Sequence, residues 1–181
     1  MQDLSQFNNI SFSRGSSVIK ELIWRLTQWF FFRIDFITAY AFKSKILRFF
    51  GAKIERNITW KPLAKVTFPW KLSIGENSWI GEEVWMLNLA PINLGKNVCI
   101  SQRAFLCTGS HHWSKRSFDL IVKPITIENG VWICANVFVG AGVTIGENTL
   151  VTAGSVVNKD LPPNMICSGN PCVPIKPRVF E

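Results

Sequence analysis

The apolar positions of this chain recur with a period of six residues. Small residues often follow them four positions later, as at Val131, Val137, Val143, Thr149 and Ser155. Such a period is typical of a parallel β-helix, in which each unit forms one flat side and about three units form one triangular coil. We predict that the aliphatic residue of each unit points to the axis and stacks on its equivalents in neighbouring coils. The clearest run is Ile127, Ile133, Val139, Ile145, Val151 and Val157.

A β-sandwich with glycine-rich turns is the competing fold. It predicts alternation with a period of two and turns about every eight to twelve residues. Here the period of six is sustained, and glycine often follows the aliphatic residue where the backbone must turn tightly, as at Gly75, Gly95 and Gly146. The pattern therefore favours an all-β main domain built as a parallel β-helix.

Two irregularities interrupt the repeat. The run Ile74, Ile80, Met86 slips by two residues at Asn88–Pro91 before the period resumes at Leu94. A second interruption of twenty-one residues separates Leu106 from Ile127, and twenty-one is not a multiple of six. Part of this segment must leave the coil, and loops on a rigid scaffold often carry function.

The chain divides into three predicted parts. Residues 1–51 form a basic, aromatic and helical N-terminal segment, residues 52–171 form the β-helix with an excursion loop at 108–124, and residues 172–181 form a C-terminal tail. Residues 1–71 hold twelve lysines and arginines against four acidic residues, whereas residues 72–181 hold eight against eight. All of the net charge of +8 therefore lies before the main repeat run.

Three interpretations compete for the aromatic segment at residues 18–50, whose first helix Ser16 or Ser17 would cap. A transmembrane helix needs about twenty nearly uncharged residues, and charges such as Lys20, Arg25 and Asp35 interrupt every such window. A helical cover on the β-helix or on a neighbouring subunit, and a helical pair lying on an anionic membrane, are both favoured and compatible. Nucleic acid is disfavoured because the basic residues are interleaved with apolar ones.

Five cysteines fall within or beside repeat units, and no Cys-x-x-Cys pair or His/Cys cluster suggests a metal site. We expect the thiols to be reduced, as in a cytoplasmic protein. The protein itself would be cytoplasmic, either in solution or bound peripherally to the inner face of the cytoplasmic membrane. No secretory signal is recognisable at the N-terminus. Several units end in an aromatic residue predicted to face outward, which side-by-side subunits or the N-terminal helices would cover: Trp79, Trp85, Phe105, Trp132 and Phe138.

The only two histidines, His111 and His112, both lie in the excursion. The unperturbed pKa of histidine is close to neutrality, so the side chain suits proton removal from a hydroxyl or an amine. We predict that one of the two is a general base. Asp119, Glu82 and Glu83 are the candidates for orienting its imidazole.

Several runs of the chain resemble the hexapeptide-repeat acetyltransferases, most closely those of colanic acid biosynthesis and more distantly the galactoside, maltose and xenobiotic O-acetyltransferases. The resemblance covers nearly the whole chain. It is carried by the runs I-G-E-N-S-W-I-G, N-L-A-P-I, C-I-S-Q-R-A-F-L-C-T-G-S-H, V-G-A-G-V-T-I-G-E-N, T-A-G-S-V-V-N-K-D-L-P-P-N and S-G-N-P-C.

The resemblance implies a left-handed β-helix that forms a homotrimer, with active sites in the clefts between prisms and acetyl-CoA as acyl donor. It maps the catalytic histidine to His111 and places the backbone N–H of Ala135 near the thioester carbonyl. His112 stands where close relatives often carry aspartate. Further residues expected at the acetyl-CoA site are Trp132, Ala153, Gly154, Lys159 and Lys176, with Arg178 beside the last.

For the acceptor we predict contacts with Glu83, Asn88 and Trp113. The expected function is O-acetylation of a sugar hydroxyl in exopolysaccharide or capsule biosynthesis, on a sugar or a lipid-linked oligosaccharide, by direct attack with a histidine base. The alternatives are N-acetylation of an amino sugar and a non-catalytic trimeric scaffold.

Overall fold

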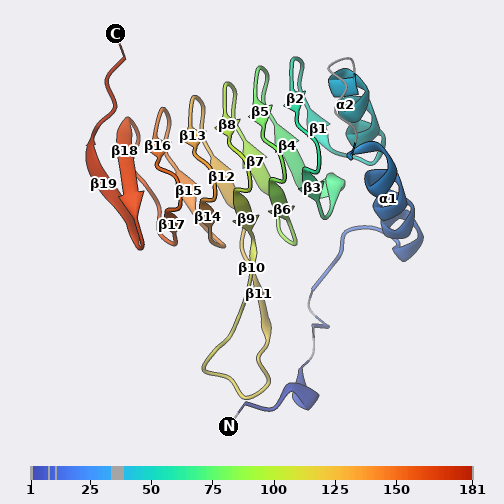
Figure 1. Cartoon of the computed structure of the whole chain (residues 1–181). Helices are drawn as coiled ribbons and strands as arrows, with labels where there is room; N and C mark the ends of the chain where they lie inside the picture. Colours follow the sequence, from blue (N-terminus) through green and yellow to red (C-terminus); the bar gives the residue numbers. More distant parts are fainter. Residues whose placement is uncertain (1, 8, 11, 34–38, 181) are drawn as a thin grey trace.

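The computed structural model describes residues 2–7, 9–10, 12–33 and 39–180. Stacked coils run from two helices at one end to a pair of long strands at the other, and one hairpin projects from the stack (Figure 1). Asp35, one of the charges cited against a transmembrane helix, lies outside the described residues. The predicted all-β main domain with a helical N-terminal segment is confirmed.

Each coil contributes one strand to each of three parallel faces. Face A contains β1 (Lys53–Ile54), β4 (Leu72–Ile74), β7 (Ile92–Leu94), β12 (Ile125–Ile127) and β15 (Thr144–Ile145). Face B contains β2 (Thr59–Trp60), β5 (Trp79–Ile80), β8 (Cys99–Ile100), β13 (Trp132–Ile133), β16 (Leu150–Val151), β18 (Met165–Gly169) and β19 (Cys172–Pro177). Face C contains β3 (Lys65–Val66), β6 (Trp85–Leu87), β9 (Phe105–Cys107), β14 (Phe138–Val139) and β17 (Val156–Val157).

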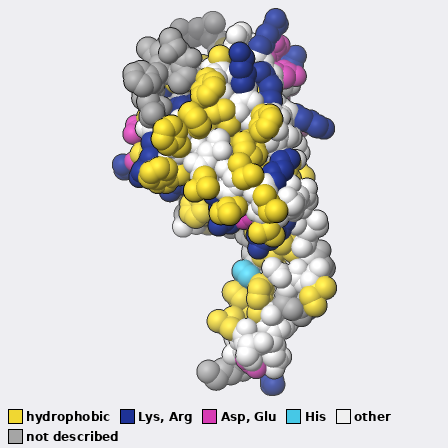
Figure 2. All heavy atoms as spheres, turned by 90° about the vertical axis from the view of Figure 1, so that its right-hand side faces the viewer, with side chains coloured by type: hydrophobic (Ala, Val, Ile, Leu, Met, Phe, Trp, Pro, Cys, Tyr) yellow, Lys and Arg dark blue, Asp and Glu magenta, His cyan; other side chains and the backbone are white. Residues whose placement is uncertain are grey.

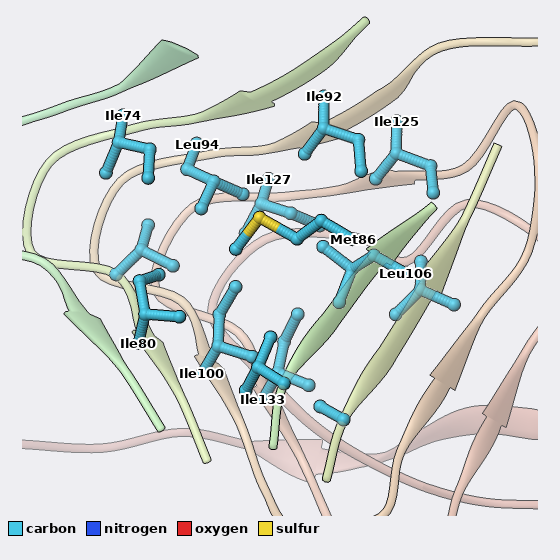
Figure 3. Close-up of a cluster of buried hydrophobic side chains, with 14 of the residues drawn as sticks. Ile74, Ile80, Met86, Ile92, Leu94, Ile100, Leu106, Ile125, Ile127 and Ile133 are labelled. Carbon is cyan, nitrogen blue, oxygen red and sulfur yellow. The ribbon is translucent and has the colours of Figure 1, made fainter. Parts of the chain in front are cut away.

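The aliphatic residue of each unit forms the core, as predicted. Ile80 pairs with Ile100, and Ile100 with Ile133, in the strand register of face B. Their side chains and those of faces A and C point into the axis from three directions (Figure 3). The small residues four positions later are buried as well, including Val131, Val137 and Thr149. Packing alone therefore accounts for the period of six.

The coil lengths explain the slip in the repeat. Ile127 pairs with Ile145, eighteen residues on, whereas Ile74 pairs with Leu94, twenty residues on. The two additional residues lie at the corner from face C to face A. The preceding coil is also twenty residues long and has the short helix η2 (Pro69–Lys71) at the same corner.

Two helices close the first end of the prism. Helix α1 (Val18–Phe31) begins after Ser17, whose side chain accepts a hydrogen bond from the Lys20 N–H, and helix α2 (Ala39–Phe49) follows. The buried Trp24 indole donates to the Val66 carbonyl at 2.8 Å, and the Trp60 indole donates to Ser44 Oγ at 3.0 Å. The predicted helical cover is thus confirmed. Within the described part of the chain, neither helix is long and apolar enough to cross a membrane.

The opposite end is closed differently. Strand β19 turns back and pairs antiparallel with β18, so residues 172–177 belong to the sheet of face B although the sequence predicted only a tail. The repeat gave no sign of this strand, because an antiparallel strand does not continue the six-residue register.

Outward-facing aromatic residues remain on the sides of the prism. Trp85 stacks on Phe105 with ring centroids 4.7 Å apart, and Phe105 contacts Phe138 at 5.6 Å along face C. Trp79 and Trp132 are 61% and 41% exposed on face B. The N-terminal helices cover the end of the prism and leave these rings open, which corrects the expectation that the helices wrap its sides.

Candidate active site

The excursion is a hairpin that leaves the prism at the corner from face C to face A. Strand β10 (Gly109–His111) pairs antiparallel with β11 (Leu120–Val122), placing His111 opposite Leu120. The base of the hairpin is anchored because the Thr108 N–H donates to the Leu87 carbonyl and the Lys123 N–H donates to the Thr108 carbonyl. A two-stranded ladder therefore carries His111 away from the coil on an ordered stem (Figure 1).

The imidazole of His111 is oriented by Phe118. Its Nδ1 lies 2.8 Å from the Phe118 carbonyl oxygen, and its ring stacks on the Phe118 ring with centroids 4.1 Å apart. A carbonyl oxygen only accepts hydrogen bonds, so Nδ1 carries the proton of the neutral ring and Nε2 keeps its lone pair. In this geometry Nε2 is the ring nitrogen that can accept a hydrogen bond or a proton.

Phe118 adopts a conformation that is uncommon for its residue type. Its φ is +51°, in the left-handed region that a large side chain rarely enters. This turn brings both the carbonyl and the ring of Phe118 against His111. Uncommon backbone conformations of this kind cluster at functional sites. The sequence analysis missed Phe118 because its main contribution is a backbone carbonyl, which every residue possesses.

None of the three proposed carboxylates orients His111. The Asp119 carboxylate accepts a hydrogen bond from Lys115 Nζ at 2.9 Å, and hydrogen bonds from Ser117 and Lys115 lower the pKa of Asp119. Glu82 and Glu83 lie at a different corner of the prism. His112 is exposed near the hairpin tip, where its N–H donates to the Asp119 carbonyl. The carboxylate expectation is therefore wrong, and a carbonyl takes that place.

The N-terminal segment also reaches the hairpin, which the sequence did not indicate. The Asp3 N–H donates to the Arg116 carbonyl at 2.9 Å, just before the short helix η1 (Leu4–Gln6). The Phe7 ring then lies 5.8 Å from the His111 ring, on an approach tilted by 55°. His111 is consequently bordered by two aromatic rings from distant parts of the chain.

Three of the residues expected to bind the acyl donor lie at the corner from face B to face C, namely Ala135, Ala153 and Gly154. The Gly154 N–H donates to the Ala135 carbonyl at 2.9 Å, so successive coils stack Ala153 and Gly154 on Ala135. Ala153 and Gly154 are exposed, and a Cβ built on Gly154 meets no atom within 4 Å. Small residues therefore occupy this part of the corner, and the backbone at Gly154 borders open space.

The N–H of Ala135 is available as a donor. Its neighbours Cys134 and Asn136 donate to the carbonyls of Val151 and Gln102, whereas Ala135 donates to no atom among the described residues. A free N–H on a rigid corner can stabilise a developing oxyanion. Trp132 lies three residues earlier on face B, where its indole donates to Ser101 Oγ at 3.0 Å and lines a groove of about 370 Å³.

The basic residues expected near the donor are dispersed. Lys159 is exposed at the corner from face C to face A, the corner that also carries the hairpin. Lys176 is exposed on β19, and the Arg178 guanidinium donates to the carbonyls of Gly130 and Asn148. Arg178 therefore fastens the C-terminal strand to the coils. One protomer does not bring these three cations together.

The acceptor predictions have mixed outcomes. Asn88 is completely buried, and its amide accepts from the Phe68 N–H at 2.8 Å and donates to the Phe68 carbonyl at 2.6 Å. The proposal that Asn88 binds sugar is wrong, because its amide holds the two-residue insertion against the preceding coil.

The other two residues predicted to bind the acceptor are accessible. Glu83 pairs with Arg103 at 2.9 Å at the corner from face B to face C. Trp113 is 88% exposed near the hairpin tip and is open to a ligand.

The cysteines are free thiols within or beside the coils. Burial raises the pKa of Cys99, Cys134 and Cys172, and raises that of Cys167 to about 11. The thiolate is the nucleophilic form of cysteine. These four thiols are therefore poorly suited to form an acyl-enzyme.

His111 and Ala135 are separated within one chain. The hairpin leaves the corner from face C to face A, whereas Ala135 lies at the corner from face B to face C, with a strand of face C between them. The predicted base and the predicted oxyanion donor are thus at opposite edges of one face. One protomer therefore does not bring the predicted base and the predicted oxyanion donor together.

Comparisons with known proteins identify the family to which this repeat and fold belong. Residues 124–159 match the family model described as bacterial transferase hexapeptide (six repeats). The chain is 42% identical over 179 residues to the "Putative colanic acid biosynthesis acetyltransferase WcaF" of Escherichia coli K12, covering 99% of this chain and 98% of the relative. It is 32% identical to galactoside O-acetyltransferase of the same organism, covering 72% of this chain and 66% of that protein.

A solved structure shows the same fold. The hexapeptide-repeat acetyltransferase VCA0836 of Vibrio cholerae, crystallised with acetyl coenzyme A, superposes with a TM-score of 0.81 at 29% identity and covers 92% of both chains. The repeat, the stacked coils and these relatives lead to one conclusion: the chain belongs to the hexapeptide-repeat acetyltransferases.

Proposed function

We propose that this protein transfers an acetyl group from acetyl-CoA to a sugar hydroxyl, with His111 as general base. The observation that carries the proposal is the hydrogen bond from His111 Nδ1 to the Phe118 carbonyl, which leaves Nε2 as the proton acceptor. The relatives named as acetyltransferases, and the structure crystallised with acetyl coenzyme A, support the donor.

The proposed reaction is a direct transfer. His111 Nε2 removes the proton of the acceptor hydroxyl as its oxygen attacks the thioester carbon. The N–H of Ala135 stabilises the negative oxygen of the tetrahedral intermediate. When the carbon–sulfur bond breaks, the imidazolium returns the proton to the CoA sulfur, so the products are the acetyl ester and CoA with its free thiol.

The donor would lie along the corner formed by Ala135, Ala153 and Gly154. The small exposed residues there leave room for the pantetheine arm, and Trp132 flanks them on face B. Lys159 and Lys176 are the exposed cations proposed to meet the phosphates of CoA.

We further propose that the complete site forms between copies in a homotrimer. His111 and Ala135 lie at opposite edges of face C, so a neighbouring prism has to bring its donor corner to the hairpin. The exposed rings along faces B and C, such as Trp79 and Trp85, give side-by-side copies apolar surface to bury. One chain would contribute the base and its neighbour the oxyanion donor.

For the acceptor we propose a sugar unit of an exopolysaccharide or capsule, acetylated on the cytoplasmic side of the membrane. The full-length similarity to a relative named for colanic acid biosynthesis supports this class. The exposed Trp113 offers a ring on which the apolar face of a sugar can stack. Glu83 is paired with Arg103, and its proposed acceptor contact requires that pair to open.

The first test measures CoA release from acetyl-CoA with hexose, 6-deoxyhexose and amino-sugar acceptors, free and undecaprenyl-linked. Wild type should release CoA only when an acceptor is present, and should do so with at least one hexose or 6-deoxyhexose that has no amino group. His111→Gln should reduce the rate by about 10²- to 10⁴-fold, the usual contribution of a general base. His112→Gln is the matched control and should retain activity. Release only with amino sugars would indicate N-acetylation, and no acetyl-CoA binding would indicate a scaffold.

The second test asks whether the site is shared between copies. His111→Gln and Ala153→Trp, which blocks the donor corner, are each expected to be inactive. Co-expressed in equal amounts with different tags, they should regain about a quarter of wild-type activity, because some interfaces combine an intact hairpin with an intact corner. Ala153→Ser is the control for substitution at that position. No recovery in confirmed mixed trimers would place the whole site within one chain.

A further inference from the structure

Helix α1 turns its apolar side away from the rest of the protein. The spacing of the exposed residues follows the helical period, so they lie on one face. The side that packs on the prism contains the buried Trp24 and the buried carboxylate of Glu21 instead. We call the outward set the α1 apolar face, and its members are between 51% and 72% exposed: Val18, Ile19, Leu22, Ile23, Leu26, Trp29 and Phe30.

This surface covers the helical end of the molecule. Figure 2 looks onto that end and shows hydrophobic side chains gathered across it, with lysines and arginines around the margins. Helix α2 adds Phe42 and Phe49, which are 48% and 84% exposed. A contiguous exposed apolar patch of this kind marks an interaction surface.

The two helices that carry the patch are basic. Glu21 is the only acidic residue of the two helices, and it is buried between Arg14 and Arg25, at 2.6 and 2.5 Å. Lys45 and Arg48 are exposed on α2. The Arg33 guanidinium lies 5.2 Å from the centre of the Trp29 ring, at the border between the apolar face and its basic margin.

The distribution of charge decides between two possible partners for this surface, a second copy of the protein and an anionic lipid membrane. A second copy packed end to end would bring two positive margins together and would repel. An anionic lipid surface complements the basic margin while its acyl region accepts the apolar side chains. The arrangement of apolar centre, bordering tryptophan and outer basic residues corresponds to the layers of a lipid headgroup region.

We propose that the α1 apolar face and its basic margin bind the protein to an anionic membrane surface, with both helices lying in the headgroup region. This inference concerns location and stands independently of the proposed acetyl transfer. It explains why the helical cover is apolar on both of its sides, one against the prism and one against lipid.

The fold then sets the height of the hairpin above the membrane. The hairpin follows β9, the third strand of face C after β3 and β6. Two strand spacings and one helix diameter place the root of the hairpin roughly 20 Å from the lipid surface. A sugar joined to a lipid through a diphosphate would reach such a site without leaving the membrane. In the proposed trimer of parallel prisms, three such faces would point the same way and strengthen binding.

The test is co-sedimentation of the full chain with vesicles. Wild type should bind vesicles of phosphatidylethanolamine and phosphatidylglycerol, bind neutral phosphatidylcholine weakly, and dissociate from the anionic vesicles as salt rises. The double variant Leu22→Gln with Leu26→Gln should lower the partition coefficient at least about tenfold, because both side chains would lose their acyl contacts. The matched control is Val173→Gln with Ile175→Gln, two exposed apolar residues at the opposite end, which should bind as wild type.

A variant that removes positive charge separates the electrostatic contribution to membrane binding from the contribution of the apolar side chains. Arg33→Gln with Lys45→Gln should weaken binding to anionic vesicles several-fold and flatten its salt dependence. Failure of wild type to bind anionic vesicles would overturn the proposal, as would unchanged binding by the Leu22/Leu26 variant. A change in sedimentation coefficient of that variant without lipid, combined with no vesicle binding by wild type, would assign the face to contacts between copies. Acetyl transfer to a soluble acceptor should be unchanged in all variants.

Discussion

Two corners of the same prism differ in how regular their backbone structure is from coil to coil. The corner from face A to face B repeats one solution, with asparagine in the left-handed conformation at Asn57, Asn77, Asn97, Asn148 and Asn164, each with φ between +55° and +60°. The corner from face C to face A has a different structure in each coil. It holds η2, the buried turn at Asn88, the hairpin and the exposed Lys159. The uniform corner serves packing, and the variable one is free to carry chemistry.

The largest expected effect comes from removing the hairpin. Replacing residues 108–124 with a short turn like the one that follows β17 should abolish acetyl transfer, by at least about 10³-fold, since the general base is lost. The coils should remain folded because the apolar core residues lie outside residues 108–124. Far-UV circular dichroism and thermal unfolding test the second point. A collapse of the β-helix would contradict the separation of the two roles.

Next in size is truncation of an axial residue. Ile133 is fully buried between Ile100 and Val151, so Ile133→Ala should lower the free energy of unfolding by about 2–5 kcal/mol. Urea unfolding measures the loss. Ile133→Val is the matched control and should cost about 0.5–1.5 kcal/mol. Equal losses for the two variants would show that the axis does not pack as described.

A smaller effect is expected at the variable corner. Asn88→Ala leaves the N–H and carbonyl of Phe68 without their buried partners, which should cost about 1–3 kcal/mol of stability. The KM for the acceptor should not change, because the amide does not face the ligand. A raised KM with unchanged stability would restore the role in sugar binding that the structure contradicts.

A comparable substitution of asparagine can be made at the corner from face A to face B. Asn77→Ala places an alanine at φ +60° and should cost about 1 kcal/mol, whereas Asn77→Gly should cost less because glycine adopts this conformation freely. Thermal unfolding of the pair measures the difference. If alanine were tolerated as well as glycine, backbone conformation would not be the reason for asparagine there.

The smallest effect concerns the orientation of the base. Phe118→Gly preserves the positive φ and the carbonyl but removes the ring that stacks on His111, so kcat should fall by about tenfold or less. Phe118→Ala should fall further because alanine also strains the turn. Steady-state kinetics at saturating donor and acceptor distinguish the two. Unchanged kcat in both would mean that the hydrogen bond alone fixes the imidazole.

The sequence predicted the features that repeat. Ile127, Ile133 and Val139 revealed the core because stacking imposes the same side chain at the same register in each coil. The excursion was visible as a break in that register, and its two histidines stood out by their position. Side chains at outward positions, such as Trp85 and Phe105, followed from the same period. These inferences depend only on local spacing.

The predictions that were wrong or missing concern features that depend on three-dimensional contacts. Asn88 was identified as polar at an irregular position, but its side chain folds inward onto the backbone of the preceding coil. The orienting group of His111 is a carbonyl seven residues away, which has no sequence signature. The separation of His111 from Ala135 required knowing which corner each one occupies. An amide or a histidine in a sequence does not indicate the direction of its side chain.

The reversal of β19 also limits what can be added to this molecule. A β-helix that ended on a parallel coil would offer the backbone groups of its last coil to another chain, and stacking of this kind produces filaments. Here the final strand of face B runs antiparallel and contains Pro174 and Pro177, which lack the N–H needed to continue a ladder. The last strand of face B therefore closes the edge of that sheet, so a second molecule cannot extend face B along the axis of the prism.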